Sequence, residues 1–443
     1  MKAILFIIFS LILEIEINGN LLRNLKYEQS DINLGDDKNT YDYGTIQATS
    51  RNINISYSGS KASSIDQSVC YIDTKRIILK YAQLEKESGD SRDIEISKLY
   101  GVNAAILVQG GEVEISHSSI TTKAKGSSAL CVTNMGKATL TNPTIDSTSS
   151  SSGMGLHATY GGQIYSSYGT ISTTGSSSPS LSTLKGKGVI NCDYCTLSTS
   201  GSGSPLIYSN GEIKVTNTTG KATNAQMVVI EGKNTAATVE KFSILECYGN
   251  GKSVDNCGIL LYQSTSGNDK EGINTFNCLN SAMKILKQSK VYDSAPMFFV
   301  TNTKANINLE KCDFNYGSNI FLNIKGTSEW GKSGSNGGQV TLNLKNQEIK
   351  GDLIVDKIST LNLVMINSTF TGAINNGKTA SKLNINLDKN SKIILTKNSY
   401  YTSLTNEDKS GKNIDKKNFK FSSYDVGKWI KTSSLVLIIF LFL

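Results

Sequence analysis

The chain has 443 residues, of which 38% are hydrophobic and 19% charged, and only four are proline. The hydrophobic residues are spread evenly along the chain, which excludes a disordered protein. The formal net charge of +8 comes from scattered lysines without a basic stripe or a nucleic-acid motif, which excludes a typical nucleic-acid-binding protein.

The chain begins with the pattern of a secretory signal peptide. Lys2 precedes an apolar stretch at residues 3–13, and the small residue Gly19 offers a cleavage position for signal peptidase. We therefore expect residues 1–19 to be a signal peptide. Residues 20–42 are polar and predict a flexible N-terminal segment.

Short apolar strands recur along the middle of the chain. The early ones occupy residues 105–108, 129–132 and 155–158, at intervals of 24 and 26 residues. Most are followed by a turn and then by a segment such as residues 112–116, in which apolar and polar residues alternate. A period of two indicates strands rather than helices. Residues 94–96 are predicted as a strand of the same series.

Repeated strands without crossover helices, in units of about 25 residues, predict a solenoid of stacked coils. The predicted fold class is all-β: a single-stranded right-handed parallel β-helix of roughly a dozen coils over residues 43–400. Three clusters rich in Ser, Thr and Gly recur at coil spacing, and we interpret them as surface turns. They are residues 147–153, 175–180 and 198–204.

The chain ends with the pattern of a glycosylphosphatidylinositol anchor signal. Residues 401–423 predict a polar stalk, and residues 424–443 contain a spacer and a terminal apolar run. The last nine residues would rise only about 14 Å as a helix, roughly half of a hydrocarbon core. Ser422, Ser423 and Gly427 are the candidate attachment points. The alternative is an apolar terminus without an anchor.

Asn54, Asn217 and Asn367 lie in Asn-x-Ser/Thr sequons and are predicted N-glycosylation sites.

The eight cysteines fit disulfides or buried thiols in a secreted protein. Cys192 and Cys195 have metal-site spacing, but no second pair or nearby histidine completes such a site. We therefore predict no metal and no cofactor.

Several segments together resemble secreted β-helix proteins of the adhesin-like, pectin-lyase-like kind. Val-Val-Ile-Glu-Gly-Lys-Asn at residues 228–234 is one of them, and residues 261–267, 330–338 and 371–375 continue the likeness. The resemblance implies a right-handed parallel β-helix outside the cell. It implies no catalytic residue, ligand or reaction.

An uncharged polar residue follows many of the first strands of the coils. Stacked along the axis, these side chains would form a flat hydrogen-bonding ladder suited to glycans, or they would bond to one another and stabilise the solenoid. Four aromatic side chains would either stack on sugar rings or pack against loops: Tyr160, Tyr165, Tyr168 and Trp330. The predicted ladder consists of Gln109, Thr133, Thr159, Ser209, Gln263 and Thr301.

The leading functional prediction is a membrane-anchored cell-surface protein with an adhesive, glycan-binding or coat-structural role, whose partners are extracellular glycans or surface proteins. The alternative is a polysaccharide lyase or glycoside hydrolase. Hydrolysis needs two carboxyl groups about 5 to 10 Å apart, whereas Glu231 and Asp356 are expected roughly 19 Å apart. An enzyme would therefore use Asp269, Glu271 and Glu329, which lie on insertions at residues 266–272 and 327–338.

Overall fold

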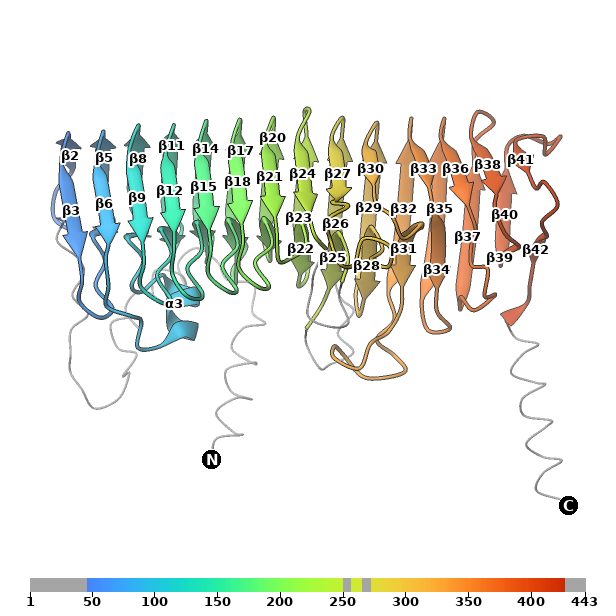
Figure 1. Ribbon diagram of the computed structural model, residues 1–443, viewed down its shortest axis with the longest axis horizontal. Coiled ribbons are helices and arrows are strands. Elements are labelled where there is room, and N and C mark those ends of the chain that lie inside the picture. The colour runs from blue at the N-terminus through green and yellow to red at the C-terminus, as the bar shows by residue number, and fades with distance from the viewer. Residues whose placement is uncertain (1–45, 250–255, 265–271, 427–443) are drawn as a thin grey trace, which may run out of the picture. The chain divides into compact units, whose positions relative to one another are not determined.

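The computed structural model describes residues 46–249, 256–264 and 272–426, and these residues form an all-β solenoid (Figure 1). Successive strands go to three long sheets in turn, so each coil before the C-terminal ones contributes one strand to each of sheets A, B and C. Neighbouring strands of each sheet come from successive coils and pair in parallel. The twelve strands of sheet A within the described residues agree with the predicted number of coils.

Sheet A contains, in spatial order, β1 (Ile46–Ala48), β4 (Cys70–Asp73), β7 (Ile106–Gln109), β10 (Leu130–Thr133), β13 (Leu156–Ala158), β16 (Leu181–Thr183), β19 (Ile207–Ser209), β22 (Val228–Glu231), β25 (Ile259–Tyr262), β28 (Phe298–Thr301), β31 (Ile320–Ile324) and β34 (Asp352–Val355). Sheet B contains β2 (Ile53–Ser56), β5 (Arg76–Lys80), β8 (Glu112–Ser116), β11 (Lys137–Thr141), β14 (Gln163–Ser167), β17 (Val189–Asp193), β20 (Glu212–Thr216), β23 (Ala236–Glu240), β26 (Asn274–Leu279), β29 (Lys304–Glu310), β32 (Gln339–Lys345), β35 (Thr360–Ile366), β37 (Lys382–Leu387) and β40 (Ser403–Asn406).

Sheet C contains β3 (Gly59–Ala62), β6 (Gln83–Lys86), β9 (Ser119–Thr122), β12 (Thr144–Ser147), β15 (Thr170–Thr173), β18 (Thr196–Thr199), β21 (Thr219–Ala222), β24 (Ile244–Cys247), β27 (Ala282–Ile285) and β30 (Asp313–Asn315). Two shorter sheets belong to the C-terminal coils. They contain β33 (Glu348–Lys350), β36 (Thr369–Gly372), β38 (Lys392–Leu395) and β41 (Ile414–Asp415), and β39 (Ser399–Tyr401) and β42 (Phe421–Ser423).

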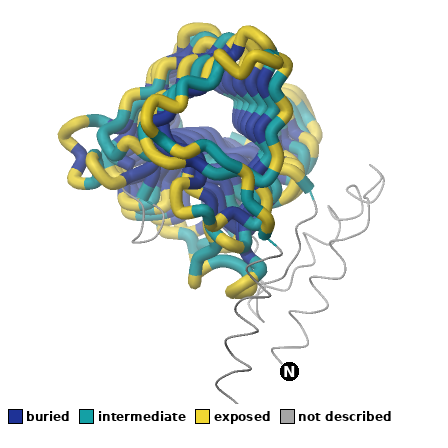
Figure 2. Tube along the Cα trace, turned by 90° about the vertical axis from the view of Figure 1, so that its right-hand side faces the viewer, coloured by how far each residue is buried: buried dark blue, intermediate teal, exposed yellow. Residues whose placement is uncertain are grey.

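The alternation of apolar and polar residues places every second side chain of sheet B in the interior. In β11, Ala138 and Leu140 are buried, whereas Lys137 and Thr141 are exposed. Leu140 pairs in register with Ile115 of the preceding coil, so like side chains stack into columns. Burying one such aliphatic side chain stabilises the fold by about 1.5–3 kcal/mol. Figure 2 shows the resulting body end-on, with buried segments around the interior.

The Ser/Thr/Gly clusters lie between a sheet C strand and the next sheet A strand, as predicted for turns. Their hydroxyls bond from coil to coil: the Ser178 Oγ accepts from the Gly153 N–H at 2.9 Å, and the Ser204 Oγ accepts from the Ser178 N–H at 2.9 Å. These buried backbone groups would otherwise lose their hydrogen bonds to water. The low-complexity segments are therefore structural turns.

The strand predicted at residues 94–96 is wrong, because this segment belongs to helix α3 (Ile94–Tyr100). Asp93 caps its start by accepting hydrogen bonds from the N–H groups of Glu95 and Ile96, and Gly101 ends it at φ 73°. Asp at an N-cap and Gly at a left-handed C-cap are strong helix signals. The helix also approaches sheet A, since the Lys98 carbonyl lies 2.6 Å from His157 Nε2.

Strands continue beyond residue 400, where the sequence predicts a polar stalk. β40 pairs with β37, and β42 pairs with β39. The physical reason is burial, because Leu404, Ile414 and Phe421 pack against the main core. Residues 401–423 are therefore part of the solenoid.

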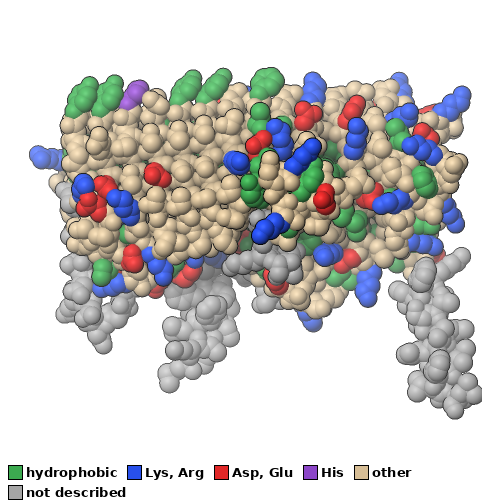
Figure 3. All heavy atoms as spheres, viewed as in Figure 1, with side chains coloured by type: hydrophobic (Ala, Val, Ile, Leu, Met, Phe, Trp, Pro, Cys, Tyr) green, Lys and Arg blue, Asp and Glu red, His purple; other side chains and the backbone are tan. Residues whose placement is uncertain are grey.

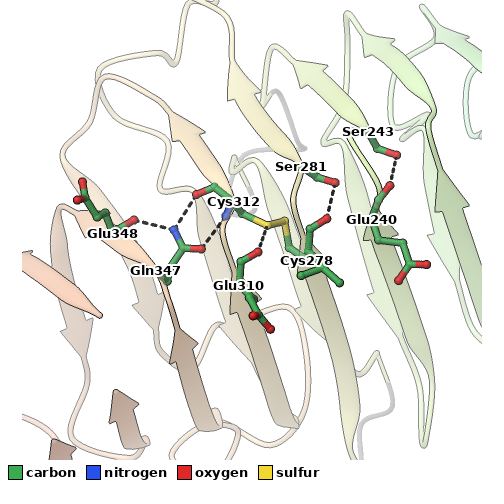
Figure 4. The surroundings of a disulfide bond; sticks show 9 residues. Glu240, Ser243, Cys278, Ser281, Glu310, Cys312, Gln347 and Glu348 are labelled. Carbon is green, nitrogen blue, oxygen red and sulfur yellow. Dashed lines mark hydrogen bonds between the residues drawn. A yellow bond between two sulfur atoms is a disulfide. The ribbon is translucent and has the colours of Figure 1, made fainter. Parts of the chain in front are cut away.

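One disulfide ties two neighbouring coils together (Figure 4). Cys278 of β26 bonds to Cys312, which follows β29 at the turn into sheet C, across a sequence separation of 34 residues. Beside it, Gln347 Oε1 accepts from the Cys312 N–H at 2.8 Å, and Gln347 Nε2 donates to the Cys312 carbonyl at 2.6 Å. The other six described cysteines are buried and lie outside this disulfide.

Candidate functional site

The six side chains of the predicted ladder are buried, and none exposes more than 9% of its surface. They bond within the protein: the Thr159 hydroxyl donates to the Thr133 hydroxyl at 2.9 Å, and the Ser209 hydroxyl donates to the Ala236 carbonyl at 2.7 Å. A buried row cannot contact a glycan. These side chains instead stabilise the solenoid, which was the alternative interpretation of the pattern.

The predicted ladder also does not form a single row. Thr133 pairs with Gln109, but Ser209 pairs with Thr183 and Ile230 in an inward-facing column. Thr301 pairs with Tyr262, so Gln263 lies one residue beyond the column. A shift of one residue moves a side chain to the other face of a strand, and the sequence alone does not show these shifts.

The sequon asparagines differ in exposure. Asn54 and Asn367 are exposed, whereas Asn217 is half-buried and donates from Nδ2 to Asp193 Oδ1 at 2.9 Å. Ser422 and Ser423, two of the anchor candidates, lie in β42 and pair with Tyr400 and Tyr401.

Several predicted features lie outside the described residues. They are the signal peptide at 1–19, the segment at 20–42, Asp269, Glu271, Gly427 and the apolar run at the C-terminus. Glu329 is described and lies exposed in the loop between β31 and β32. Within the described ranges, no helix is long and apolar enough to cross a bilayer.

A different surface, on the outer side of sheet B, gathers polar side chains. We call the outward side of β26, β29, β32, β35 and β37 the polar face. One row on it is made of amides: Asn308 Nδ2 donates to Asn277 Oδ1 at 2.8 Å, and Asn343 Nδ2 donates to Asn308 Oδ1 at 2.7 Å. Each amide has two N–H donors and two acceptor lone pairs, so these bonds leave further capacity for a ligand.

The polar face contains a shallow depression with a volume of about 290 Å³. Its floor is formed by the inward-pointing Ala305, Val340 and Leu361, and none of the described lining residues is a carboxylate. Two lysines, at the start of β29 and of β37, are the charged groups of the described lining. The other lining residues are one exposed apolar residue, Ile273, and the polar residues Lys304, Asn306, Gln339, Thr341, Thr360, Asn362, Lys382 and Asn384.

These residues lie side by side because the sheet register aligns them. Asn306 pairs with Thr341, Thr341 with Asn362, and Asn362 with Asn384. Parallel strands place such residues about 4.8 Å apart. The result is a nearly flat array of donors and acceptors with a positive charge at each side, which can bind a chain of hydroxyl-rich or acidic units.

A second polar group lies on the outer side of sheet A, around Glu231. Tyr208 and Tyr262 both donate their hydroxyls to Glu231 Oε2, the latter at 2.7 Å. The Tyr262 ring lies 4.6 Å from the Trp330 ring between centroids. Glu231 and Asp356 are separated by four strand steps in sheet A, as predicted, and Asp356 accepts hydrogen bonds from the backbone of Gly326 and Ile358. One carboxylate with two phenol donors does not provide the pair that glycoside hydrolysis requires.

In comparisons with family models, curated proteins and solved structures, nothing matches this chain. The long all-parallel sheets are compatible with the predicted parallel β-helix, and the adhesin-like resemblance remains a prediction. The function must therefore be argued from the residues of the polar face.

Proposed function

We propose that this chain is a right-handed, single-stranded parallel β-helix that acts at the outer cell surface and binds glycans through the polar face. The observation that carries the proposal is the depression over sheet B, lined by amides, hydroxyls and two lysines without a carboxylate. The signal-peptide and anchor patterns of the sequence support the location.

The charge of the depression favours acidic glycans over neutral ones. Lys304 and Lys382 flank an uncharged floor, and the whole chain carries a net charge of +8. Lysine is a compact positive charge with three donors, which suits carboxylate and sulfate groups. The amide and hydroxyl rows between the lysines would bond the sugar hydroxyls.

The same chemistry favours binding over hydrolysis. Hydrolysis of a glycosidic bond uses an acid and a base or nucleophile, and both are normally carboxyl groups. The described lining of the depression contains neither. A glycan held there would therefore not be hydrolysed by a carboxyl pair.

The test is binding of the purified chain to polygalacturonate, chondroitin sulfate and the neutral β-glucan laminarin, with analysis of new reducing or unsaturated ends. The Lys304→Gln and Lys382→Gln double variant should weaken binding of the acidic polymers at least tenfold, that is, by about 1.4 kcal/mol or more. Lys137→Gln is the matched control, because Lys137 lies on the same outer side of sheet B in a distant coil. Equal loss in both variants, or release of new chain ends, would contradict the proposal.

A further inference from the structure

A row of residues in the left-handed conformation marks the turn from sheet B to sheet C. The row has one residue after each of the first twelve strands of sheet B, with φ between 46° and 62°, and Lys241 beside Phe242 is also left-handed at φ 54°. We call it the turn row. In chain order its members are Tyr57, Tyr81, His117, Asn142, Tyr168, Tyr194, Asn217, Phe242, Asn280, Lys311, Asn346 and Asn367.

Backbone preference explains the asparagines and His117 of the turn row but not the tyrosines and the phenylalanine. Asparagine is among the few residues that adopt positive φ readily, whereas a bulky residue there is an outlier. All six rings of the row, including the His117 imidazole, belong to the first eight coils. Something other than the turn itself must favour them.

Burial does not explain them either. Tyr57 exposes 79% of its surface, Tyr168 exposes 60%, and Phe242 exposes 80%. The apolar and histidine side chains along the upper edge of Figure 3 form a line at this turn. Exposed aromatic residues gathered along one edge of a protein usually mark an interaction surface.

The rings stack in groups that end at the asparagines. Tyr57 stacks on Tyr81 at 4.8 Å and Tyr81 on His117 at 5.2 Å, and Tyr168 stacks on Tyr194 at 5.2 Å. Within the described part of the chain, no ring contact crosses Asn142 or Asn217. Each of these asparagines therefore stands between two aromatic rings that do not touch.

The spacing across an asparagine suits a saturated sugar ring. Two coil steps separate His117 from Tyr168, which is about 10 Å. Two carbon contacts of about 4 Å each leave roughly 2 Å for the inserted group. A puckered pyranose ring is thicker than a flat aromatic ring and therefore occupies more of that space. The C–H groups of a sugar face also carry partial positive charge, which the negative face of an aromatic ring attracts.

Charge at the turn row indicates a neutral ligand. Asp193, beside Tyr194, accepts from the Thr216 hydroxyl and from Asn217 Nδ2. Glu240, near Phe242, pairs with Lys214 at 2.7 Å. Lys241, next to Phe242, acts electrostatically on Asp193. The charges near the rings thus oppose one another, unlike the lysine-flanked depression of the polar face.

We propose that the turn row contains a second glycan-binding site, confined to its two asparagine gaps: hexose rings of a neutral polysaccharide insert between His117 and Tyr168 over Asn142, and between Tyr194 and Phe242 over Asn217. The Asn142 and Asn217 amides bond the hydroxyls of the inserted sugar. This site does not depend on the polar face, and it selects neutral glycans. Asn217 is also a predicted glycosylation site, so the chain for the test is produced without N-glycosylation.

The test measures binding of laminarin and galactomannan by titration calorimetry. His117→Asn and Tyr168→Asn each replace a ring by the residue that the turn tolerates best, so the fold should be kept. Each change should weaken binding to the site over Asn142 roughly tenfold, which corresponds to about 1.4 kcal/mol. Tyr168→Phe, which keeps the ring, should bind as the unchanged protein does.

Tyr57→Asn is the matched control, because Tyr57 is exposed in the same row but lies two coils from His117. It should leave binding within about twofold. Unchanged binding in His117→Asn and Tyr168→Asn, or no binding of either neutral polymer by the unchanged protein, would overturn the proposal. Loss of neutral binding in the Lys304→Gln and Lys382→Gln variant would also overturn it, because that result assigns the binding to the polar face.

Discussion

The coils before residue 250 and those after residue 272 are joined by sheets A and B but fill their interiors differently. In the first group, hydroxyls point into the corner between sheets C and A: the Ser147 Oγ donates to the Gly153 carbonyl at 2.8 Å, and the Thr173 Oγ1 donates to the Ser178 carbonyl. In the second group, Phe276, Phe298 and Phe321 pack against one another. Stacked coils can thus be stabilised by polar columns or by aromatic packing.

The two groups also differ in strand length and surface. From β5 to β23 the sheet B strands have five residues, whereas β29, β32 and β35 have seven. Longer strands provide more outward positions, which the second group fills with the amides of the polar face. The first group instead carries all six rings of the turn row. The comparison suggests two binding surfaces on one scaffold, one polar and one aromatic.

The largest expected effect is in the aromatic core. Phe298 is fully buried, and its ring lies 5.5 Å from that of Phe276 and 5.3 Å from that of Phe321. Phe298→Ala should lower the free energy of unfolding by about 3–5 kcal/mol, because it leaves a cavity. Denaturant unfolding measures the change, and hydrogen exchange should place it in the neighbouring coils. Phe242→Ala, which removes an exposed ring, should change stability by less than about 0.5 kcal/mol.

The disulfide should have the next largest effect. It closes a loop with a sequence separation of 34 residues, and loop-closure entropy gives it about 3–4 kcal/mol of stabilisation. The Cys278→Ala and Cys312→Ala double variant should lose about this much in denaturant unfolding. A reducing agent should destabilise the unchanged protein but not the variant. A similar response of both proteins would mean that another thiol pair is involved.

A smaller effect is expected at the inner side of the turn between sheets B and C. Ser243 is fully buried; its Oγ accepts from the Thr218 N–H at 3.0 Å and donates to the Glu240 carbonyl at 2.8 Å (Figure 4). Ser243→Ala should cost about 1–3 kcal/mol, because it leaves a buried N–H without a partner. Ser202→Ala, at an exposed turn position, is the control and should be nearly neutral.

The smallest effect is a pH dependence in the first group of coils. Burial lowers the pKa of His157 below its ordinary value of 6.5. Below pH 6.5 the unfolded chain therefore binds a proton that the folded chain does not, so stability falls as the pH falls. By pH 5.5 this contribution reaches up to about 1.4 kcal/mol.

His157→Gln removes the titrating ring and is the comparison for that pH dependence. Between pH 7.5 and pH 5.5 the unfolding free energy of the unchanged protein should fall relative to that of this variant. A difference independent of pH would show that His157 does not couple protonation to folding.

Local chemistry made most of the fold predictable. The period-two alternation in β8 and β11 defines which side chains face the interior, and the turn clusters recur at coil spacing. Helix α3 was missed because its signals, Asp93 and Gly101, enclose only seven residues. The C-terminal coils were missed because their strands are short and polar, and a few apolar side chains such as Phe421 attach them to the core.

The sequence by itself determined that this protein is all-β and repetitive, because strand alternation and turn composition are local properties. Only the tertiary structure decided which residues become neighbours. Asn308 follows Asn277 by 31 residues, and Asn343 follows Asn308 by 35 residues, yet their side chains bond to one another. The rings of His117 and Tyr168 likewise belong to different coils. Coil lengths vary with each inserted loop, so the register that aligns such residues arises from pairing between strands distant in the chain. The same register buried the predicted ladder and created the polar face and the turn row.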